Sequence, residues 1–484
     1  MANPTALRLL KSNLPADCVV TDPVAVKPFE TDGLTAYREK PWVVVLPESV
    51  DQVRTVLRIC REYDVPVVTR GAGTGLSGGA LPLSDGVLLT LTKMNRILEV
   101  DKDACTAIVE PGVTNLAISA AVEHHGLYYA PDPSSQIACS IGGNVAENSG
   151  GVHCLKYGLT VHNVLGITVQ TIEGDQLVLG GKVLDAPGYD LLAVMTGSEG
   201  MLGVVTEIVV KLLPQPAEKR VLLAAFDDIR TAGDAVGAII AGGIIPAGLE
   251  MMDSLAIQAA EDFSHAGYPR NAKAILLCEL DGTVGEVTVD VERVKDVLTT
   301  VGATEMRVAV SAFEREVLWR GRKSAFPAVG RIAPDYYCMD GTIPRRHLGE
   351  VLAQIEVLSN RFGLAVANVF HAGDGNLQPL ILYDSNVPGE LQKAEAFGAE
   401  ILELCVAVGG TVTGEHGVGV EKLDKMCVQF SNAELNQFHR LKAAFDPRGL
   451  MNPGKAVPTL ARCSEIGGMH VHGGRLAHPD VERF

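Results

Sequence analysis

Apolar residues in the first 213 positions fall into short runs that alternate with helical patterns. Residues 42–47 and 65–68 each predict a strand, and between them apolar residues recur at helical spacing from Val50 to Cys60. Ser49 followed by Gln52 predicts a capping box at the start of that helix. Further strands are predicted in GVLLTL and TAIVEP, and a helix in NLAISAAVEHH ends at a glycine. This order predicts a mixed region of short helices and strands.

The stretch LLPQPAEKR at 212–220 carries two prolines followed by charge, the strongest boundary signal in the chain. Beyond it, AILLCELDG and LAVANVFH predict strands, while VTVDVERVKDVLTTVG and LGEVLAQIEVLSNRFG predict helices. From about residue 431 the pattern is helical until FDPRGLMNPGK. We therefore expect two mixed regions and then a shorter helical segment.

The composition is that of an ordinary globular protein of 484 residues, 47% hydrophobic and 20% charged, which is enough chain for two or three domains. The net charge of −17 argues against a general nucleic-acid binder, which needs a basic surface. The ten cysteines include no CxxC pair, so reduced thiols are predicted rather than a zinc ribbon or an iron–sulfur cluster. Because no long apolar segment is present, we expect a cytoplasmic protein whose membrane contact would be peripheral.

A glycine-rich stretch, VTRGAGTGLSGGALP, contains the dinucleotide fingerprint GxGxxG at Gly73, Gly75 and Gly78. In a Rossmann fold this loop opens a helix, but here Pro82 and Gly86 break any helix before the next strand. The loop therefore predicts either a nest of backbone N–H groups that cradles a pyrophosphate or a flexible surface loop. Two later small-residue stretches, PDPSSQIACSIGGNVAENSGG and GSEGMLGVVTE, favour the nest, since a long ligand can lie against backbone in several places.

These glycine stretches, together with GRKSAFPAVGRIAPDYYCMDGTIPRR, GEHGVG and the tail MHVH with a terminal ERF, carry a family resemblance. The chain resembles the vanillyl-alcohol-oxidase-type FAD-linked oxidases, and over nearly its whole length the FAD-binding D subunits of bacterial glycolate oxidase (glycolate dehydrogenase). Relatives of these subunits oxidise D-lactate and D-2-hydroxyglutarate. The resemblance implies an α+β fold with an N-terminal segment (1–37) and a PCMH-type FAD-binding domain of two subdomains (38–216). A substrate or cap domain follows, with an antiparallel sheet covered by helices (217–430), and then a helical segment and tail that pack on the FAD domain (431–484).

The resemblance also implies one FAD, bound non-covalently because the first glycine loop offers no histidine or cysteine as an anchor. Its pyrophosphate would lie on the 70–79 loop, and the later stretches and the C-terminal segment would hold the remainder. The implied cofactor-binding residues are Arg70, Gly71, Ala72, Gly73, Thr74, Gly75, Ser77, Gly78, Gly79, Pro131, Ser135, Gly142, Gly143, Asn144, Gly200, Gly203, Val204 and Asn452.

Flavin-dependent oxidation of a 2-hydroxy acid needs a cation for the carboxylate and a base for the hydroxyl proton. The segment VLWRGRKSAF offers Arg320, Arg322 and Lys323, although such a cluster is also typical of a charged helix surface. The family pattern W-x-x-R selects Arg322, three residues after Trp319, as the catalytic and carboxylate-binding arginine. Lys323 and Asn376 are the other implied substrate-binding residues.

Two polar loops, FHAGDGNLQP and TVTGEHGVG, supply the remaining candidates, although a Glu-His pair on a loop is often only a surface feature. By resemblance His371 and Glu415 are metal ligands and His416 is the base. Gln378 stands where the family motif HxGDGNLH has its second histidine ligand. A glutamine oxygen binds zinc less well than imidazole does, so we expect a weakened site for one divalent ion, zinc first and iron or manganese otherwise. Asp374 is predicted to cap its own loop.

Histidines outside these loops are interpreted as structural. His153 is one of several that lack a partner at any telling spacing. The tail MHVHGGRLAHP could bind metal through His470 and His472, but a docking tail is favoured.

The prediction is therefore oxidation of a short 2-hydroxy acid, glycolate to glyoxylate first and D-lactate to pyruvate second, by hydride transfer to the flavin. D-2-hydroxyglutarate oxidation and a non-catalytic, FAD-carrying scaffold subunit are the alternatives. Electrons would leave to partner subunits or a quinone, because the chain lacks cluster-forming cysteines. The family implies a second FAD-domain subunit and an iron–sulfur subunit as partners, with membrane contact only through them on the inner face of the cell membrane.

Overall fold

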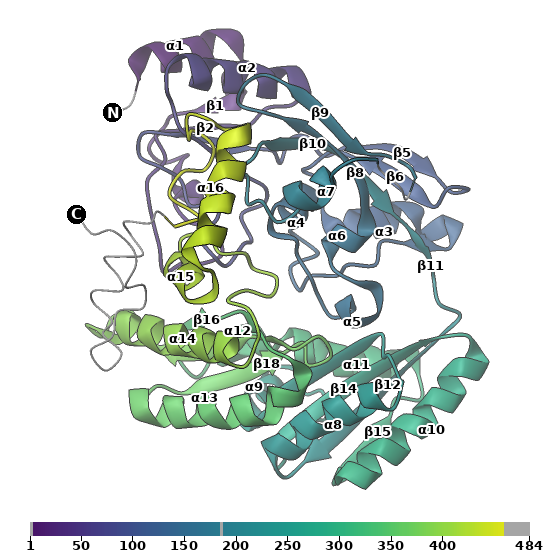
Figure 1. The fold of residues 1–484 in the computed structure, drawn as a ribbon. Helices are drawn as coiled ribbons and strands as arrows, with labels where there is room; N and C mark the ends of the chain where they lie inside the picture. The colour runs from purple at the N-terminus through teal and green to yellow at the C-terminus, as the bar shows by residue number, and fades with distance from the viewer. Residues whose placement is uncertain (1–2, 184–186, 459–484) are drawn as a thin grey trace. The chain divides into compact units, whose positions relative to one another are not determined.

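The structure, a computed structural model, describes residues 3–183 and 187–458. The chain forms two compact units, and Figure 1 colours it by position in the sequence. Unit 1 comprises Met1–Ser149, Leu159–Pro214 and Glu415–Phe484, and unit 2 comprises Gly150–Gly158 and Gln215–Gly414. The chain therefore passes from unit 1 into unit 2 and back twice, the first time only for a short segment.

Unit 1 contains two main sheets. The first has the order β1-β2-β4-β3, with β2, β4 and β3 parallel and β1 antiparallel to β2. The second is antiparallel throughout, in the order β5-β6-β10-β8-β9. The strands of this unit are β1 (Val19–Val20), β2 (Val43–Val45), β3 (Val67–Arg70), β4 (Val87–Thr90), β5 (Ile97–Asp101), β6 (Thr106–Val109), β7 (Leu127–Tyr128), β8 (Val164–Gln170), β9 (Gln176–Gly180), β10 (Val204–Lys211) and β11 (Leu213–Pro214). Its helices are α1 (Pro4–Asn13), α2 (Val50–Glu62), α3 (Asn115–Val122), α4 (Ile141–Glu147), α6 (Thr160–Asn163), α7 (Leu191–Met195), α15 (Met426–Gln429) and α16 (Asn432–Phe445).

The helix predicted after the first strand run forms as α2. Ser49 Oγ accepts a hydrogen bond from the Gln52 N–H at 3.4 Å, which confirms the predicted N-cap. The side chain of Gln52 accepts from the Glu48 N–H at 2.8 Å, so the return bond of the capping box reaches one residue further back. The apolar face of α2 joins the strands of the first sheet in one hydrophobic cluster.

Unit 2 is built on one seven-stranded antiparallel sheet in the order β15-β12-β14-β13-β18-β20-β16. Its strands, with the short pair β17 and β19, are β12 (Glu218–Phe226), β13 (Gly248–Asp253), β14 (Ala274–Gly282), β15 (Glu305–Val308), β16 (Asp335–Cys338), β17 (Gly341–Thr342), β18 (Val366–Phe370), β19 (Asn376–Leu377) and β20 (Pro379–Tyr383). Its helices are α5 (Cys154–Tyr157), α8 (Ile229–Ala241), α9 (Ser254–Ser264), α10 (Val284–Val301), α11 (Ala312–Lys323), α12 (Ala325–Val329), α13 (Leu348–Phe362) and α14 (Glu390–Ala407).

Helices cover both faces of this sheet (Figure 1). Val221 and Leu223 of β12 pack in one cluster with residues of α9, α11 and α12. The alternate residue Leu222 is equally buried and faces the opposite side, where α8 and α10 contact the same strands. Strands buried on both faces read as continuous apolar runs, which is why VLLAAF and AILLC show no alternation. The predicted α+β fold with a helix-covered antiparallel sheet is confirmed.

Among the described residues, eight cysteines form no disulfide, and seven of these eight are buried. Cys427 is disulfide-bonded, so the expectation of reduced thiols is wrong for that residue, because scattered spacing does not reveal which thiols meet in space. Within 3–183 and 187–458, no helix has both the length and the apolar character needed to cross a bilayer. The predicted docking tail with His470 and His472 lies outside the described residues.

Candidate functional site

The first glycine-rich loop connects β3 to β4 with no helix between them, as predicted. Gly73 and Gly78 have φ angles of +76° and +75°, in the left-handed region that side chains disfavour. A Cβ on Gly73 would also collide with the guanidinium of Arg70, whose Nη1 donates a hydrogen bond to Thr31 O at 2.8 Å. The loop therefore lies against an arginine side chain and, since no helix follows it, is not a Rossmann turn; its left-handed glycines agree with the predicted nest.

One serine joins this loop to the second small-residue stretch. The hydroxyl of Ser140 accepts hydrogen bonds from the N–H of Ala72 at 3.3 Å and from the N–H of Gly143 at 3.4 Å. A Cβ on Gly71 would collide with the same hydroxyl. The structure thus brings together Ala72 and Ser140, which are 68 residues apart in the chain.

The other predicted cofactor residues lie on neighbouring backbone of unit 1. A Cβ on Gly200 would lie 3.3 Å from the Cβ of Thr69, which places the third stretch beside β3. The remaining positions are Thr74 and Gly75 in the first loop, Pro131 and Ser135 before α4, Gly142 in the first turn of α4, Gly203 directly before β10 and Val204 as its first residue.

Three predicted cofactor residues carry buried polar atoms without a hydrogen-bond partner among the described residues. These atoms are Ser77 Oγ, Asn144 Nδ2 and Asn452 Oδ1. Each such atom costs about 1–3 kcal/mol unless a ligand satisfies it. A cofactor with polar groups along its whole length would satisfy them, so these residues fit FAD.

A polar cluster of Glu199, Asn452 and Lys455 holds the end of the glycine loop in position. Asn452 Nδ2 donates to Gly79 O at 3.0 Å and to Glu199 O at 2.7 Å, and Lys455 Nζ also donates to Gly79 O at 3.0 Å. The Glu199 carboxylate accepts from the N–H groups of Val418 at 2.8 Å and of the next glycine at 2.7 Å. Asn452 and Lys455 are thereby hydrogen-bonded to the glycine loop.

Burial shifts the titration of this cluster. It raises the pKa of Glu199 and of the neighbouring Glu147, and for Glu147 the charge of Glu199 adds to the effect. Burial lowers the pKa of Lys455 to about 7, although the charges of Asp32 and Glu199 oppose this. Holding a charged Lys455 here is costly, and its bonds to backbone carbonyls offset part of the cost.

In unit 2, Glu250, Arg322 and His371 form a buried charged set, the Glu250 group. Their exposed fractions are 1%, 2% and 3%. Glu250 Oε1 lies 2.7 Å from His371 Nδ1, and Glu250 Oε2 lies 2.7 Å from Arg322 Nη2. The ladder between β13 and β18 pairs Met251 with Phe370, so Glu250 and His371 are next in register.

Arg322 keeps unused donors in this buried position. Its Nε and Nη2 have no hydrogen-bond acceptor with suitable geometry in the described part of the chain, although Nη2 is at ion-pair distance from Glu250. Arg322 is thus available to an added anion. Lys323, the next residue, is exposed at the end of α11 and is not brought into the Glu250 group.

The loop that carries the other predicted residues of unit 2 is buried and ordered by its own hydrogen bonds. Asp374 Oδ1 accepts from the Asn376 N–H at 3.1 Å, which confirms the predicted loop cap. Asn376 Oδ1 is buried without a hydrogen-bond partner among the described residues, and Gln378 is 3% exposed. A Cβ on Gly414 would collide with the Asn376 side chain, so the last residue of unit 2 lies beside this loop. Glu415 and His416 begin the last stretch of unit 1; the first is buried and the second is half-buried.

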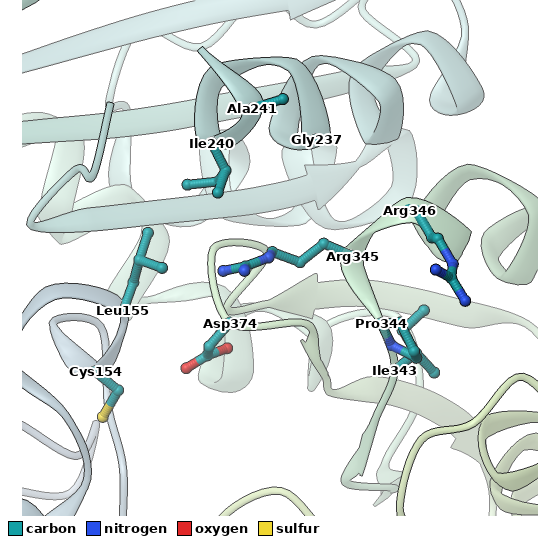
Figure 2. A pocket seen from close by; sticks show the side chains of 10 residues that line it. All are labelled: Cys154, Leu155, Gly237, Ile240, Ala241, Ile343, Pro344, Arg345, Arg346 and Asp374. Carbon is teal, nitrogen blue, oxygen red and sulfur yellow. The ribbon is translucent and has the colours of Figure 1, made fainter. Parts of the chain in front are cut away.

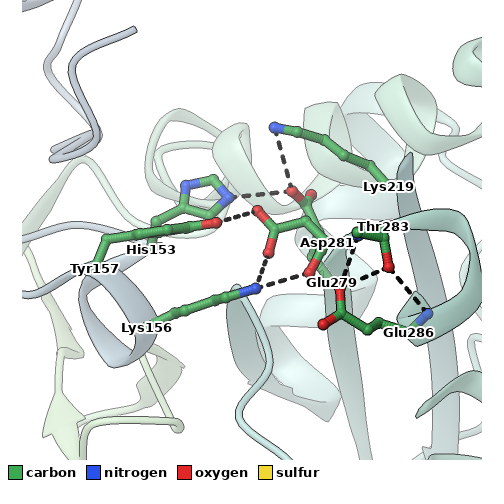
Figure 3. Close-up of polar contacts among 8 residues, drawn as sticks. All are labelled: His153, Lys156, Tyr157, Lys219, Glu279, Asp281, Thr283 and Glu286. Carbon is green, nitrogen blue, oxygen red and sulfur yellow. Dashed lines mark hydrogen bonds and ion pairs between the residues drawn. The ribbon is translucent and has the colours of Figure 1, made fainter. Parts of the chain in front are cut away.

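The short segment 150–158, which belongs to unit 2, is bound to β14 by ionic contacts and hydrogen bonds (Figure 3). His153 Nε2 lies 3.1 Å from Glu279 Oε1, and Tyr157 donates to Asp281 at 2.6 Å. Trp319 Nε1 donates to the other Glu279 oxygen at 2.6 Å. Burial alone raises the pKa of Glu279, but the bond from His153, with further help from Lys219 and Trp319, lowers it to about 2. His153 therefore has a buried acidic partner that lies 126 residues away, a structural contact that agrees with its predicted structural role and that sequence spacing does not reveal.

A pocket of about 600 Å³ lies next to the 371–378 loop (Figure 2). Asp374 lines it together with Arg345, whose Nη1 donates to Gly373 O at 2.8 Å. Leu155 and Ile240 supply apolar wall. No residue of the Glu250 group lines this pocket, so we do not assign the substrate to it.

Two family models match the chain. One, described as an FAD binding domain, matches residues 41–180, and the other, described as FAD linked oxidases, C-terminal domain, matches residues 215–456. The chain belongs to the FAD-linked oxidases. This FAD-linked oxidase is 62% identical to the glycolate oxidase subunit GlcD of Escherichia coli (strain K12), covering 99% of this chain and 96% of the relative. It is 31% identical to a D-lactate dehydrogenase of Anaerostipes hadrus, covering 93% and 97%.

Among solved structures, p-cresol methylhydroxylase with substrate bound superposes with a TM-score of 0.79 at 19% identity, covering 94% of this chain and 97% of that one. At this identity the likeness shows the fold alone. The predicted resemblance, the FAD cofactor and the class, an FAD-linked oxidoreductase, are confirmed by the family and its relatives.

The sequence of this FAD-linked oxidase did not predict Glu250, Glu199 and Lys455, which contact the candidate site residues. Glu250 stands in an ordinary apolar strand, GLEMMD, and its charge there is the one available signal. Glu199 and Lys455 lie within recognised glycine and proline motifs, but nothing in those motifs distinguishes a cofactor contact from a support.

Replacing Lys455 with Met should change how stability depends on pH. The folded pKa of about 7 lies below the value in the unfolded chain, so above pH 7 the unfolded state binds more protons and stability rises with pH. The Lys455→Met variant lacks this contribution, which amounts to at most about 1.4 kcal/mol per pH unit. Denaturant unfolding of both proteins at pH 7, 8 and 9 measures the difference. Exposed Lys40→Met is the control, and equal pH slopes for the wild type and Lys455→Met would contradict the assignment.

Proposed function

We propose that this FAD-linked oxidase oxidises a short 2-hydroxy acid, glycolate first and D-lactate second, to the corresponding 2-oxo acid. The observation that carries the proposal is the buried guanidinium of Arg322 with unused donors. A carboxylate is the ligand that a planar guanidinium fork binds best. The names of the relatives agree with this chemistry, since one is a glycolate oxidase subunit and another a D-lactate dehydrogenase.

The Glu250 group favours a small monocarboxylate. It holds one arginine, which is enough for one carboxylate. D-2-hydroxyglutarate would need a second cation for its distal carboxylate, and neither exposed Lys323 nor any other described residue joins the group for that purpose. Oxidation of D-2-hydroxyglutarate is therefore the second candidate.

His416 is the proposed base for the hydroxyl proton. Gly414 lies beside Asn376, and Glu415 and His416 are the next two residues in the chain. Because consecutive Cα atoms are about 3.8 Å apart, chain connectivity alone keeps both residues close in space to the 371–378 loop. Bound FAD supplies the acceptor for the hydride. In this scheme Arg322 holds the substrate carboxylate, Asn376 hydrogen-bonds the substrate through its side-chain amide, and His416 takes the hydroxyl proton.

A divalent ion would be held by His371, Gln378 and Glu415. The contact with Glu250 places the imidazole proton on Nδ1, which makes Nε2 the nitrogen that can act as a ligand, and the amide oxygen of Gln378 is a weaker but acceptable donor. These residues fit a hard or borderline cation such as zinc. Such an ion would bind the substrate hydroxyl and lower its pKa.

A non-catalytic, FAD-carrying subunit is the rival proposal, and Gln378 is the residue that favours it. The unused donors of buried Arg322 count against it, because a scaffold has no use for a desolvated guanidinium. Electrons would pass to partner chains, since the relative is a subunit by name, and an FAD-containing and an iron–sulfur subunit are the proposed partners. We propose a cytoplasmic location with membrane contact only through these partners.

Anaerobic mixing with glycolate, D-lactate, L-lactate and D-2-hydroxyglutarate tests the proposed reaction. Glycolate, then D-lactate, should bleach the flavin absorbance. Arg322→Lys should slow bleaching about 100-fold, because lysine cannot form the bidentate contact. Arg320→Lys, two residues away and exposed, is the matched control and should behave as the wild type. A wild type whose flavin is not bleached by any of the four acids would be the scaffold instead.

The state of the flavin is tested separately. The first glycine loop contains no histidine or cysteine, so the yellow colour should leave the protein when it is precipitated with acid. Absorbance of the supernatant at the flavin maximum measures the released cofactor. A yellow pellet with a colourless supernatant would mean a covalent bond.

Gln378→His tests the metal proposal. Restoring a second imidazole should tighten zinc binding about tenfold or more while the fold is kept, because imidazole is the stronger zinc ligand. Metal analysis and chelator competition on the FAD-loaded protein measure it, with exposed Gln354→His as the control for an added histidine. An active wild type without a stoichiometric ion, and no gain in Gln378→His, would show that Arg322 and His416 suffice.

A further inference from the structure

The Glu250 carboxylate contacts two predicted functional residues at once. One oxygen lies 2.7 Å from His371 Nδ1 and the other 2.7 Å from Arg322 Nη2. All three side chains are at most 3% exposed, and the contacts join a strand, a helix and a loop that are far apart in sequence. We propose that Glu250 is a positioning residue for the reaction, which fixes the tautomer of His371 and the orientation of Arg322. The inference rests on the proposed function.

The contact with His371 decides which ring nitrogen faces the reaction. A carboxylate can only accept, so Nδ1 carries a proton, and in the neutral imidazole Nε2 then keeps its lone pair. Histidines that bind metals commonly donate their other N–H to a carboxylate, which fixes the ring and strengthens the ligand. Because Glu250 sits on β13 and His371 directly follows β18, the paired strands hold this geometry rigidly.

The contact with Arg322 supplies a counter-charge without using up the guanidinium. Nη2 and Glu250 Oε2 are at ion-pair distance, but neither atom has a hydrogen bond of suitable geometry in the described structure, and Nε is unpaired as well. The arginine is therefore held in place with donors to spare. Helix α11 is anchored one turn earlier, where Trp319 donates to Glu279 at 2.6 Å.

Only a carboxylate can serve both neighbours. A glutamine at position 250 can accept from His371 Nδ1–H through its carbonyl oxygen, but its amide N–H groups would then point at the donors of Arg322. The arginine would lose its counter-charge and turn away from its present direction. The same replacement keeps the side-chain size, but it leaves the buried guanidinium of Arg322 without its counter-charge, so Glu250→Gln should also lower the free energy of unfolding.

The strand also provides a matched control. Asp253, on the same strand, is a buried carboxylate that accepts from the Ala256 N–H at 2.9 Å and from Asn368 Nδ2 at 2.8 Å. It caps α9 and holds β18, and it contacts neither Arg322 nor His371. A purely structural carboxylate on β13 is therefore available for comparison.

The experiment compares wild type, Glu250→Gln, Glu250→Asp and Asp253→Asn as full-length, FAD-loaded proteins. Zinc affinity is measured by chelator competition without substrate, and KM and kcat for glycolate with a dye acceptor. Glu250→Gln should weaken zinc binding 10–100-fold and raise KM about tenfold or more at unchanged FAD content. Glu250→Asp, which keeps the charge on a shorter side chain, should fall between Glu250→Gln and wild type and serves if Glu250→Gln does not fold. Asp253→Asn should lower the melting temperature alone.

The outcomes separate this inference from the proposed function. A wild type that turns over glycolate, together with a Glu250→Gln variant of wild-type zinc affinity and KM, overturns the positioning role and leaves the function intact. Equal losses in Asp253→Asn would also overturn it, because they would trace to stability. A wild type that neither binds zinc nor turns over glycolate overturns the proposed function, and the positioning role with it.

Discussion

Unit 2 depends on a charge that is expensive to bury. A guanidinium with no water and no partner would cost several kcal/mol, and the carboxylate of Glu250, itself 1% exposed, is what makes buried Arg322 tolerable. Such a triad is a poor way to gain stability, since apolar side chains of similar volume often stabilise as much. The triad is useful, however, if Arg322 has to bind an anion, because its guanidinium is buried and still has unused donors. Strand pairing between β13 and β18, which brings Glu250 opposite His371, is therefore as much a part of the site as the charged groups themselves.

In unit 1, buried polar side chains hold a backbone loop in position, as Glu250 holds two side chains in unit 2. The glycine loop has left-handed φ angles at Gly73 and Gly78, and Asn452 and Lys455 hold the carbonyl of Gly79. The buried, unpaired atoms of Ser77 and Asn144 complete the pattern of polar groups prepared for a ligand. Both units therefore hold buried polar atoms without hydrogen-bond partners among the described residues on hydrogen-bonded supports, an arrangement that would preorganise them for the proposed ligands.

The sequence predicted the residues proposed to contact the cofactor or substrate better than it predicted the residues that hold those side chains in position. Glycine spacing, the missing helix after residue 78 and the polar ends of apolar strands all depend on local chemistry, so the loops, the α+β fold and the cap of Asp374 could be predicted. Glu250 and Glu279 lie in otherwise apolar strands that each carry one further acid, Asp253 and Asp281, and their partners lie 121 and 126 residues away. Local patterns do not encode such pairings. They follow from strand order, which no periodicity specifies.

The positions at which the chain crosses between the two units place a further constraint on the predicted functional residues. The chain leaves unit 1 directly after α4 with its glycines, and it returns to unit 1 between Gly414 and Glu415. Both crossings thus adjoin loops that carry predicted functional residues, and the first is bound into unit 2 through His153 and Glu279. Glu279 also holds Trp319, one helical turn from Arg322. The segment 150–158 therefore shares the buried Glu279 carboxylate with α11, the helix that carries the proposed substrate arginine. A covalent and ionic path joins this segment to that helix whatever the arrangement of the two units.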